Sequence, residues 1–205
     1  ACDARRTTPA GKTMTTPCDA PPRAAYVHVP FCRHRCGYCD FTLVARRDDL
    51  IPQYLQALES ELQQLKSPRP VETLFIGGGT PTHLPPDDLE RLLRLLADWF
   101  PLQPGYEFSI EANPSGLTDQ HLGVLAAAGV NRISLGVQSF DRRHLQTLER
   151  DHTPEEVREV VERARPVIAN ISLDLIFAVP GQTIDDWEAT LDRAMSAGPA
   201  QIWTS

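Results

Sequence analysis

An α/β fold is predicted for this chain of 205 residues, with strands and helices alternating along its length. Six segments have the length and apolar content of buried strands. Segments with helical periodicity lie between them, and residues typical of helix caps mark where several helices start. Short connections between alternating strands and helices imply a parallel sheet with right-handed crossovers. The pattern fits either a doubly wound sheet or part of a (β/α) barrel, and by itself it does not choose between them.

The candidate strands are short runs of apolar or alternating residues, bounded by glycine, proline or polar residues. They cover residues 25–31, 72–79, 106–114, 132–140, 171–181 and 200–205. Between them, apolar side chains at helical spacing predict helices. These spacings occur within residues 50–65, 89–100 and 122–126.

Local signals mark where helices begin and end. Thr153 and Thr183 each offer a hydroxyl cap, with an acidic residue three positions later. Gly129 and Gly198 follow the ends of helical patterns, where a left-handed residue commonly closes a helix. Helices are therefore predicted to start after both threonines and to end before both glycines.

The composition excludes several classes of protein. With 41% hydrophobic residues, the chain can bury a sizeable core. Its formal net charge of -7 argues against broad binding to nucleic acid, although Arg33, His34 and Arg35 form a local basic patch. No run of about 18 apolar residues and no secretory signal is visible. We therefore expect a cytoplasmic protein with no membrane span and no nucleic-acid partner.

The two ends of the chain differ in character. Residues 1–23 are rich in threonine, proline and alanine and lack periodicity, so they are predicted to form a disordered tail in which Cys2 and Cys18 are incidental. Residues 24–205 are predicted to form the core domain. The last candidate strand reaches the final residue, so we expect the chain to be an N-terminal fragment of a longer protein that lacks its C-terminal domain.

Three cysteines at the spacing C-x3-C-x2-C lie in "YVHVPFCRHRCGYCDF", and they are Cys32, Cys36 and Cys39. Clustered thiols in a chain without an export signal favour a metal site over disulfides. Thiolates select soft metals, so the candidates are zinc and an iron–sulfur cluster. A structural zinc ion needs a fourth ligand, for which His28 and His34 are the nearest candidates. A cluster can be held by three cysteines, which leaves one iron open.

Other polar residues are predicted to meet the cysteines at one mouth, because the C-terminal ends of parallel strands carry the chemistry in such folds. They are the segment "GGGTPT" at residues 77–82, Glu111 and Asn113, Gln138, and Asp174. Because charges are costly inside apolar strands, Glu111 and Asp174 need a partner or a polar cavity. The segment "GGGTPT" lacks both the P-loop pattern and the dinucleotide fingerprint, so phosphate binding is not supported.

Together these motifs resemble the radical S-adenosylmethionine (SAM) superfamily, and within it the branch of HemW-type haem chaperones and oxygen-independent coproporphyrinogen III oxidases (dehydrogenases). The resemblance runs from about residue 25 to the end of the chain and rests on "YVHVPFC", C-x3-C-x2-C, "GGGTPT", "EANP", "GVQSF", "LERDHT" and "DLIFAVPGQT". It implies a partial (β/α)6 TIM-like barrel that is truncated at the sixth strand.

The resemblance also implies the ligands. Cys32, Cys36 and Cys39 would hold a [4Fe-4S] cluster whose fourth iron binds SAM, and SAM would be cleaved to a 5'-deoxyadenosyl radical. Gly78, Gly79 and Thr80 would contact the methionine part of SAM, Glu111, Gln138, Arg150 and Asp174 would hold its amino acid and ribose groups, Tyr38 and Ile176 would flank the adenine, and Tyr26 would lie near the cluster. No residue is assigned a catalytic role.

Within the branch, the chain is more similar to the haem chaperones. Asp40 and Phe41 follow the third cysteine, where the oxidase has a further cysteine two residues on, and only the tail precedes Tyr26. Ala178 stands where the family commonly has glycine. The resemblance therefore implies haem or porphyrin as a ligand, a haem-receiving respiratory protein, and an electron donor such as flavodoxin or ferredoxin. The alternatives are the oxidase and, in another class, a zinc-stabilised binding module.

Overall fold

A computed structural model describes residues 22–205 and contains one six-stranded, fully parallel sheet. Its strands are β1 (Ala24–Val29), β4 (Val71–Gly78), β5 (Leu102–Ala112), β6 (Arg132–Gln138), β7 (Asn170–Leu175) and β8 (Gln201–Thr204). All six predicted strands are present. Two short strands, β2 (Phe31–Cys32) and β3 (Val44–Ala45), pair separately beside the sheet and flank the cysteine-containing segment.

The order of the strands decides between the two predicted architectures. In the sheet each strand lies beside its neighbour in sequence, in the order β1-β4-β5-β6-β7-β8, and every pairing is parallel. A doubly wound sheet would reverse its order at a switch point. The sheet instead turns steadily in one direction, so the prediction of a partial (β/α)6 barrel is confirmed.

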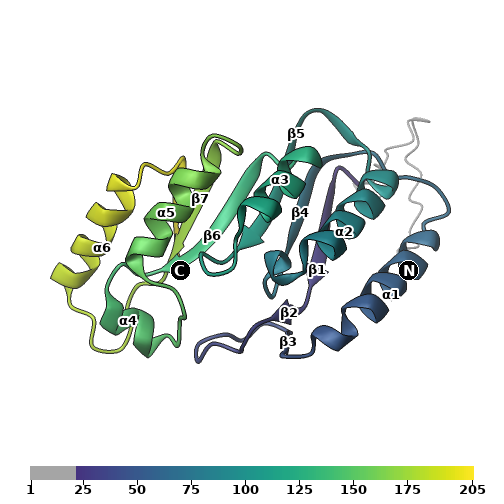
Figure 1. Ribbon diagram of the computed structural model, residues 1–205. Helices are drawn as coiled ribbons and strands as arrows, with labels where there is room; N and C mark the ends of the chain where they lie inside the picture. Colours follow the sequence, from purple (N-terminus) through teal and green to yellow (C-terminus); the bar gives the residue numbers. More distant parts are fainter. Residues whose placement is uncertain (1–21) are drawn as a thin grey trace, which may run out of the picture.

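Helices cover one face of this sheet (Figure 1). They are α1 (Ile51–Gln63), α2 (Pro86–Trp99), α3 (Asp119–Ala127), α5 (Pro154–Ala164) and α6 (Ile184–Ser196), with the shorter α4 (Arg142–Thr147) and the 3-10 turns η1 (Asp48–Leu50) and η2 (Pro81–His83). Thr153 and Thr183 form the predicted capping boxes at the starts of α5 and α6. Gly129 and Gly198 have φ of +83° and +67°, as their C-cap positions require.

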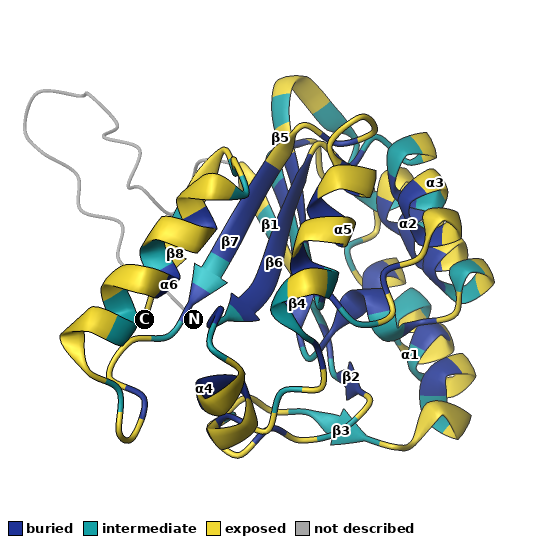
Figure 2. Cartoon of the chain, turned by 60° about the vertical axis from the view of Figure 1, so that its left-hand side comes forward, coloured by how far each residue is buried: buried dark blue, intermediate teal, exposed yellow. Residues whose placement is uncertain are grey.

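The hydrophobic core lies between the helices and the sheet. Leu89, Leu92, Leu93 and Leu96 of α2 are almost fully buried and belong to one continuous cluster with the strands. Burying one such side chain contributes about 1.5–3 kcal/mol. The helices are buried on the side that meets the sheet and exposed on the other (Figure 2). The helical spacing of apolar residues in the sequence therefore reflects the packing of the helices against the sheet.

Two regions differ from the expected boundaries. The predicted strand 171–181 ends at Leu175, because the next residues form a loop in which Ala178 has φ of +58°. Most of the predicted tail, residues 1–21, lies outside the described residues. Arg23, the last residue of the predicted tail, is instead ordered, because it forms an ion pair with Glu72 and its carbonyl accepts the amide of Glu72 at 2.7 Å. In the part of the chain that the structure describes, no helix is long and apolar enough to cross a bilayer.

Candidate functional site

The concave face of the sheet, opposite the helices, opens into a cavity of about 1000 Å³. All the predicted site residues except Tyr26 line it. They reach it from the cysteine loop, from the ends of β4, β5, β6 and β7, and from the segment after α4. The predicted convergence at the C-terminal ends of the strands is therefore what the structure shows.

The cysteine loop is docked on the segment that follows α4. His34 Nε2 donates to the carbonyl of Glu149 at 2.7 Å, and Arg33 forms an ion pair with Asp151 at 3.4 Å. Gly37 lies so close to Glu149 that a Cβ at this glycine would be 3.0 Å from the carboxylate. Cys32 and Cys36 are buried, and Cys39 is half-buried. With the loop held by these contacts, all three cysteines line the same cavity.

The arrangement of the sulfur atoms bears on which metal they could hold. A tetrahedral zinc ion with bonds of about 2.3 Å places its sulfur ligands roughly 3.8 Å apart. Among residues 22–205, the three cysteine sulfurs do not all lie within 4.8 Å of one another. A cluster spreads its thiolates over separate iron atoms and so accepts a wider spacing. The geometry therefore favours the cluster over a single zinc ion.

The candidate fourth zinc ligands are also engaged elsewhere. His28 Nε2 donates to the carbonyl of Thr42 at 2.8 Å, and its Nδ1 lies 3.3 Å from the hydroxyl of Tyr26. His34 Nε2 carries its proton toward Glu149, as described above. A ring nitrogen that donates its proton to a carbonyl cannot also bind a metal, so each histidine could offer only its Nδ1. Both histidines thus stabilise the surrounding loops in this structure.

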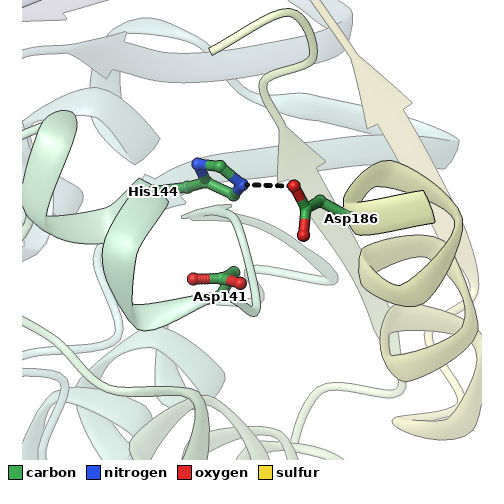
Figure 3. Close-up of side chains that lie close together, drawn as sticks. All are labelled: Asp141, His144 and Asp186. Carbon is green, nitrogen blue, oxygen red and sulfur yellow. Dashed lines mark ion pairs between the residues drawn. The ribbon is translucent and has the colours of Figure 1, made fainter. Parts of the chain in front are cut away.

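A second group of metal-type side chains lies away from the cavity, between α4 and α6 (Figure 3). His144 Nε2 is 3.5 Å from Asp186, and Asp141 lies beside them. Arg143 bridges the two carboxylates at 2.8 and 3.0 Å and holds the pKa of Asp141 at about 2. Because the guanidinium already pairs with both acids, this group joins two helices and is a poor cation site.

Glycines let the backbone after β4 approach its neighbours. Gly78 has φ of +116°, and a Cβ on Gly79 would lie 2.6 Å from the carbonyl oxygen of Phe31. The amide of Gly78 donates to Glu111 Oε2 at 2.9 Å. Burial raises the pKa of Glu111. One carboxylate oxygen of Glu111 therefore accepts a hydrogen bond from the glycine backbone, and both groups line the cavity.

Asp174 resembles Glu111 in its setting. Burial raises its pKa, while Ser134 donates to both of its carboxylate oxygens, at 3.0 and 2.8 Å. Gln138, at the bulge that ends β6, has φ of +66°. Its backbone carbonyl accepts a hydrogen bond from the amide of Ile176 at 2.9 Å. Strained backbone of this kind is typical of ligand sites. The predicted acids therefore do face a polar cavity.

Arg150 connects the cysteine loop to the sheet. Its guanidinium donates to Asn113 Oδ1 and to the carbonyl of Gly136, both at 2.7 Å, and lies 3.5 Å from Cys36 Sγ and from the Tyr38 hydroxyl. Its Nε is buried and has no hydrogen-bond partner among the described residues. Arg150 therefore contributes a positive charge to the cavity wall.

Two features of the site differ from expectation or were missed. Tyr26 is 59% exposed and does not line the cavity itself, although it stacks on Phe75, which does, with ring centroids 5.9 Å apart. Its role near the cluster stays a prediction. Asn113 and Ser134 bond directly to site residues, yet neither was among the predicted ligand contacts. The spacing of Asn113, two residues after Glu111 on one strand, indicated that both lie at the cavity, but not which side chains Asn113 bonds.

Comparison with known proteins gives concordant results. A family model described as "Radical SAM superfamily" matches residues 26–194. Heme chaperone HemW of Lactococcus lactis is 44% identical over 173 residues, which are 84% of this chain and 45% of that protein. Heme chaperone HemW of Bacillus subtilis is 41% identical over 179 residues, covering 85% and 47%. The chain thus spans about half the length of the curated relatives it matches.

Among solved structures, coproporphyrinogen III oxidase (HemN) of Escherichia coli, described as a radical SAM enzyme, superimposes with a TM-score of 0.82. The sequence identity is 33%, and the match covers 90% of this chain and 44% of that one.

Proposed function

This chain belongs to the radical SAM superfamily, and on that premise we propose that it holds a [4Fe-4S] cluster and SAM in its concave cavity as part of a HemW-like haem chaperone. One observation carries the proposal. Three cysteines, whose sulfurs do not all lie within 4.8 Å of one another, face a cavity whose other walls are a glycine backbone, two half-buried acids and an arginine. The superfamily uses these cofactors, and the residues here fit both of them.

The cysteines would each bind one iron of the cluster. Cys32 and Cys36 are buried, so the cluster would be shielded from water on the protein side. Burial raises the pKa of the Cys32 thiol, and binding iron would hold that sulfur as a thiolate. Within residues 22–205 no further cysteine exists to complete the set. The open iron is then available to a ligand in the cavity.

SAM suits the remaining walls by charge and shape. Its sulfonium and ammonium groups are cationic, and the half-buried carboxylates of Glu111 and Asp174 would gain from a cation that restores their charged forms. Its carboxylate suits the guanidinium of Arg150, which lines the cavity. The bare backbone at residues 78–80 admits a ligand at close range. The bound cofactors supply the electron and the radical chemistry, and the protein supplies their placement.

The haem-chaperone assignment rests on the relatives and on the cysteine segment. Both HemW proteins named above are more than 40% identical to this chain. Asp40 and Phe41 replace the cysteine-containing continuation of the oxidase. The assignment adds haem or a porphyrin as ligand, a respiratory protein as recipient, flavodoxin or ferredoxin as electron donor, and the cytoplasm as the compartment. The superposition on HemN supports coproporphyrinogen III oxidation as the second candidate.

The first experiment tests the cofactors. The chain is reconstituted anaerobically with iron and sulfide, reduced, and measured by electron paramagnetic resonance with and without SAM. We expect a [4Fe-4S] signal that SAM shifts, and its loss in Cys36→Ala but not in the control Cys18→Ala, which lies in the predicted tail. A chain that takes up zinc and gives no cluster signal would support the binding module instead.

The second experiment separates the two haem-related candidates. The reconstituted protein is titrated with haem and, separately, incubated with SAM, a reductant and coproporphyrinogen III. Stoichiometric haem binding without decarboxylated product supports the chaperone. Formation of the decarboxylated porphyrinogen supports the oxidase and contradicts the chaperone assignment.

A further inference from the structure

A continuous line of polar contacts links two of the cysteines across the cavity wall. It runs from Cys36 to Arg150 at 3.5 Å, from Arg150 to Asn113 at 2.7 Å, from Asn113 to Thr80 at 3.0 Å, and from Thr80 to Cys32 at 3.5 Å. The four contacts join segments that are far apart in sequence. Asn113 is the middle of the line and touches neither sulfur.

Hydrogen-bonding capacity sets the direction of this line. An arginine can only donate, so the Asn113 atom that meets Arg150 must be its oxygen. The amide nitrogen of Asn113 therefore faces Thr80, and it must donate to the threonine oxygen. The two neighbours thus settle the amide orientation, which the shape of asparagine alone does not.

The consequence falls on the hydroxyl proton of Thr80. Thr80 is 7% exposed, and its oxygen already accepts from Asn113. Its own proton needs an acceptor, and Cys32 Sγ lies at 3.5 Å, within reach of a hydrogen bond to sulfur. Asn113 thus aims the hydroxyl at the sulfur, and without it the threonine could donate elsewhere.

We propose that Asn113 is a positioning residue that directs the Thr80 hydroxyl onto the Cys32 sulfur and thereby raises the reduction potential of the cluster bound there. Hydrogen bonds to ligating sulfur are one of the factors that set this potential, because they stabilise the added electron. The inference rests on the proposed function, since it concerns the cluster of that site. Asn113 is followed by Pro114, which restricts its backbone to extended conformations and keeps the side chain in place.

The test is a double-mutant cycle on the reconstituted chain. The quantity measured is the midpoint potential for one-electron reduction of the cluster by dithionite without SAM. Electron paramagnetic resonance monitors the fraction of cluster that is reduced. Thr80→Val removes the donor and is expected to make the potential more negative. Asn113→Ala is expected to shift it in the same direction, while Arg150 keeps its bond to Gly136. The double variant should show no more than the shift of Thr80→Val, because Asn113 acts through the threonine.

Asn131→Ala is the matched control. Asn131 also bonds through both amide atoms, to Phe108 and Tyr106, but it does not line the cavity. Its loss should leave the potential unchanged even if stability falls. An unchanged potential in Asn113→Ala, or shifts that add in the double variant, would overturn the proposal.

A further variant keeps the test decisive if Asn113→Ala loads iron poorly. Asn113→Asp has the same shape, but its oxygen would accept the Thr80 proton and draw it away from the sulfur. Its shift should be larger in the wild-type background than in Thr80→Val, where only the added charge acts. Equal shifts in the two backgrounds would count against Asn113. If the unsubstituted chain forms no [4Fe-4S] cluster, the proposed function fails, and this inference fails with it.

Discussion

The two faces of the sheet are built from the same strands but carry different kinds of side chain, apolar on the core face and polar on the cavity face. In β6, Ile133, Leu135 and Val137 point into the helix-packed core, while Ser134 and Gln138 line the cavity. The core face consists of interchangeable apolar side chains whose energy is spread over many contacts. The cavity face consists of polar groups that each have a few specific partners. Alternate side chains of one strand therefore have different roles: one set stabilises the fold, and the other set forms the candidate site. Substitutions on the two faces should differ accordingly in whether they change stability or the site.

The largest effect should come from the core face. Leu92 of α2 is fully buried, so Leu92→Ala should lower the free energy of unfolding by about 3–5 kcal/mol. Urea unfolding of the cluster-free chain measures this loss. On the same helix Arg94, whose side chain is 71% exposed, provides the control, and Arg94→Ala should change stability by no more than about 0.5 kcal/mol. A similar cost for both would show that α2 does not pack as described.

His152 is a buried residue of the segment between α4 and α5, and it should make stability depend on pH. Its Nε2 donates to the carbonyl of Val137 at 2.9 Å, and burial, with a smaller contribution from Arg150, lowers its pKa from 6.5 to about 4. Between these values the unfolded chain binds more protons, so stability falls as the pH falls. The loss should reach about 2–3 kcal/mol near pH 4.5.

His152→Gln keeps a donor near the same carbonyl and does not titrate in this range. Urea unfolding of both proteins at pH 7 and pH 4.5 should therefore show a smaller loss in the variant. Carboxylates contribute equally to both proteins, so the difference isolates the histidine. Identical pH dependence would mean that His152 is not buried as a neutral ring.

On the cavity face, Gly79 sharpens the comparison because its neighbours are backbone atoms. A Cβ there would lie 2.6 Å from the oxygen of Phe31 and 2.7 Å from that of Pro30. Gly79→Ala should cost about 1–3 kcal/mol and abolish the effect of SAM on the cluster signal. Gly123→Ala in α3, where a Cβ meets nothing, should instead stabilise the chain by about 0.5–1 kcal/mol. Equal effects at both glycines would contradict the close approach at residues 78–80.

The smallest effect is expected at Ala178, in the loop after β7. Its φ of +58° costs an alanine about 1–2 kcal/mol. Ala178→Gly relieves this, but it adds about 0.4–1 kcal/mol of backbone freedom to the unfolded chain. The net gain should be about 0.5–1 kcal/mol in thermal or urea unfolding. Ala197→Gly, at a residue with φ of -71°, should instead destabilise, and a loss in both would argue against the left-handed conformation.

Much of the core face could be predicted from sequence because its signal is periodic and local. The leucines of α2 and the threonine caps of α5 and α6 illustrate this. The helix α4 escaped prediction because six residues do not complete two turns of a pattern. The choice of a partial barrel over a doubly wound sheet came from the resemblance of the motifs and not from the pattern of strands and helices, since it depends on which strands pair and not on what they contain.

The sequence predicted which residues line the cavity, but not which of their side chains bond to one another. The cysteines, Glu111 and Asp174 stood out because such residues are unusual in their settings. The role of Asn113 could not be read from the sequence, because its partners are Thr80 and Arg150, 33 and 37 residues away. Side-chain contacts between distant strand ends exist only once the sheet has brought those ends together. Tyr26 shows the converse, since its neighbourhood in sequence did not bring it into the cavity.

The docking of the cysteine loop on residues 149–151 has a consequence for how the chain matures during synthesis. Each strand pairs with the one made just before it in the sheet, so the sheet can grow as the chain leaves the ribosome. The cysteines emerge with the first strand, but the segment that supports their loop emerges more than 100 residues later. We therefore expect nascent chains that end before residue 149 to hold iron weakly, with stable insertion of the cluster as a late event in biogenesis.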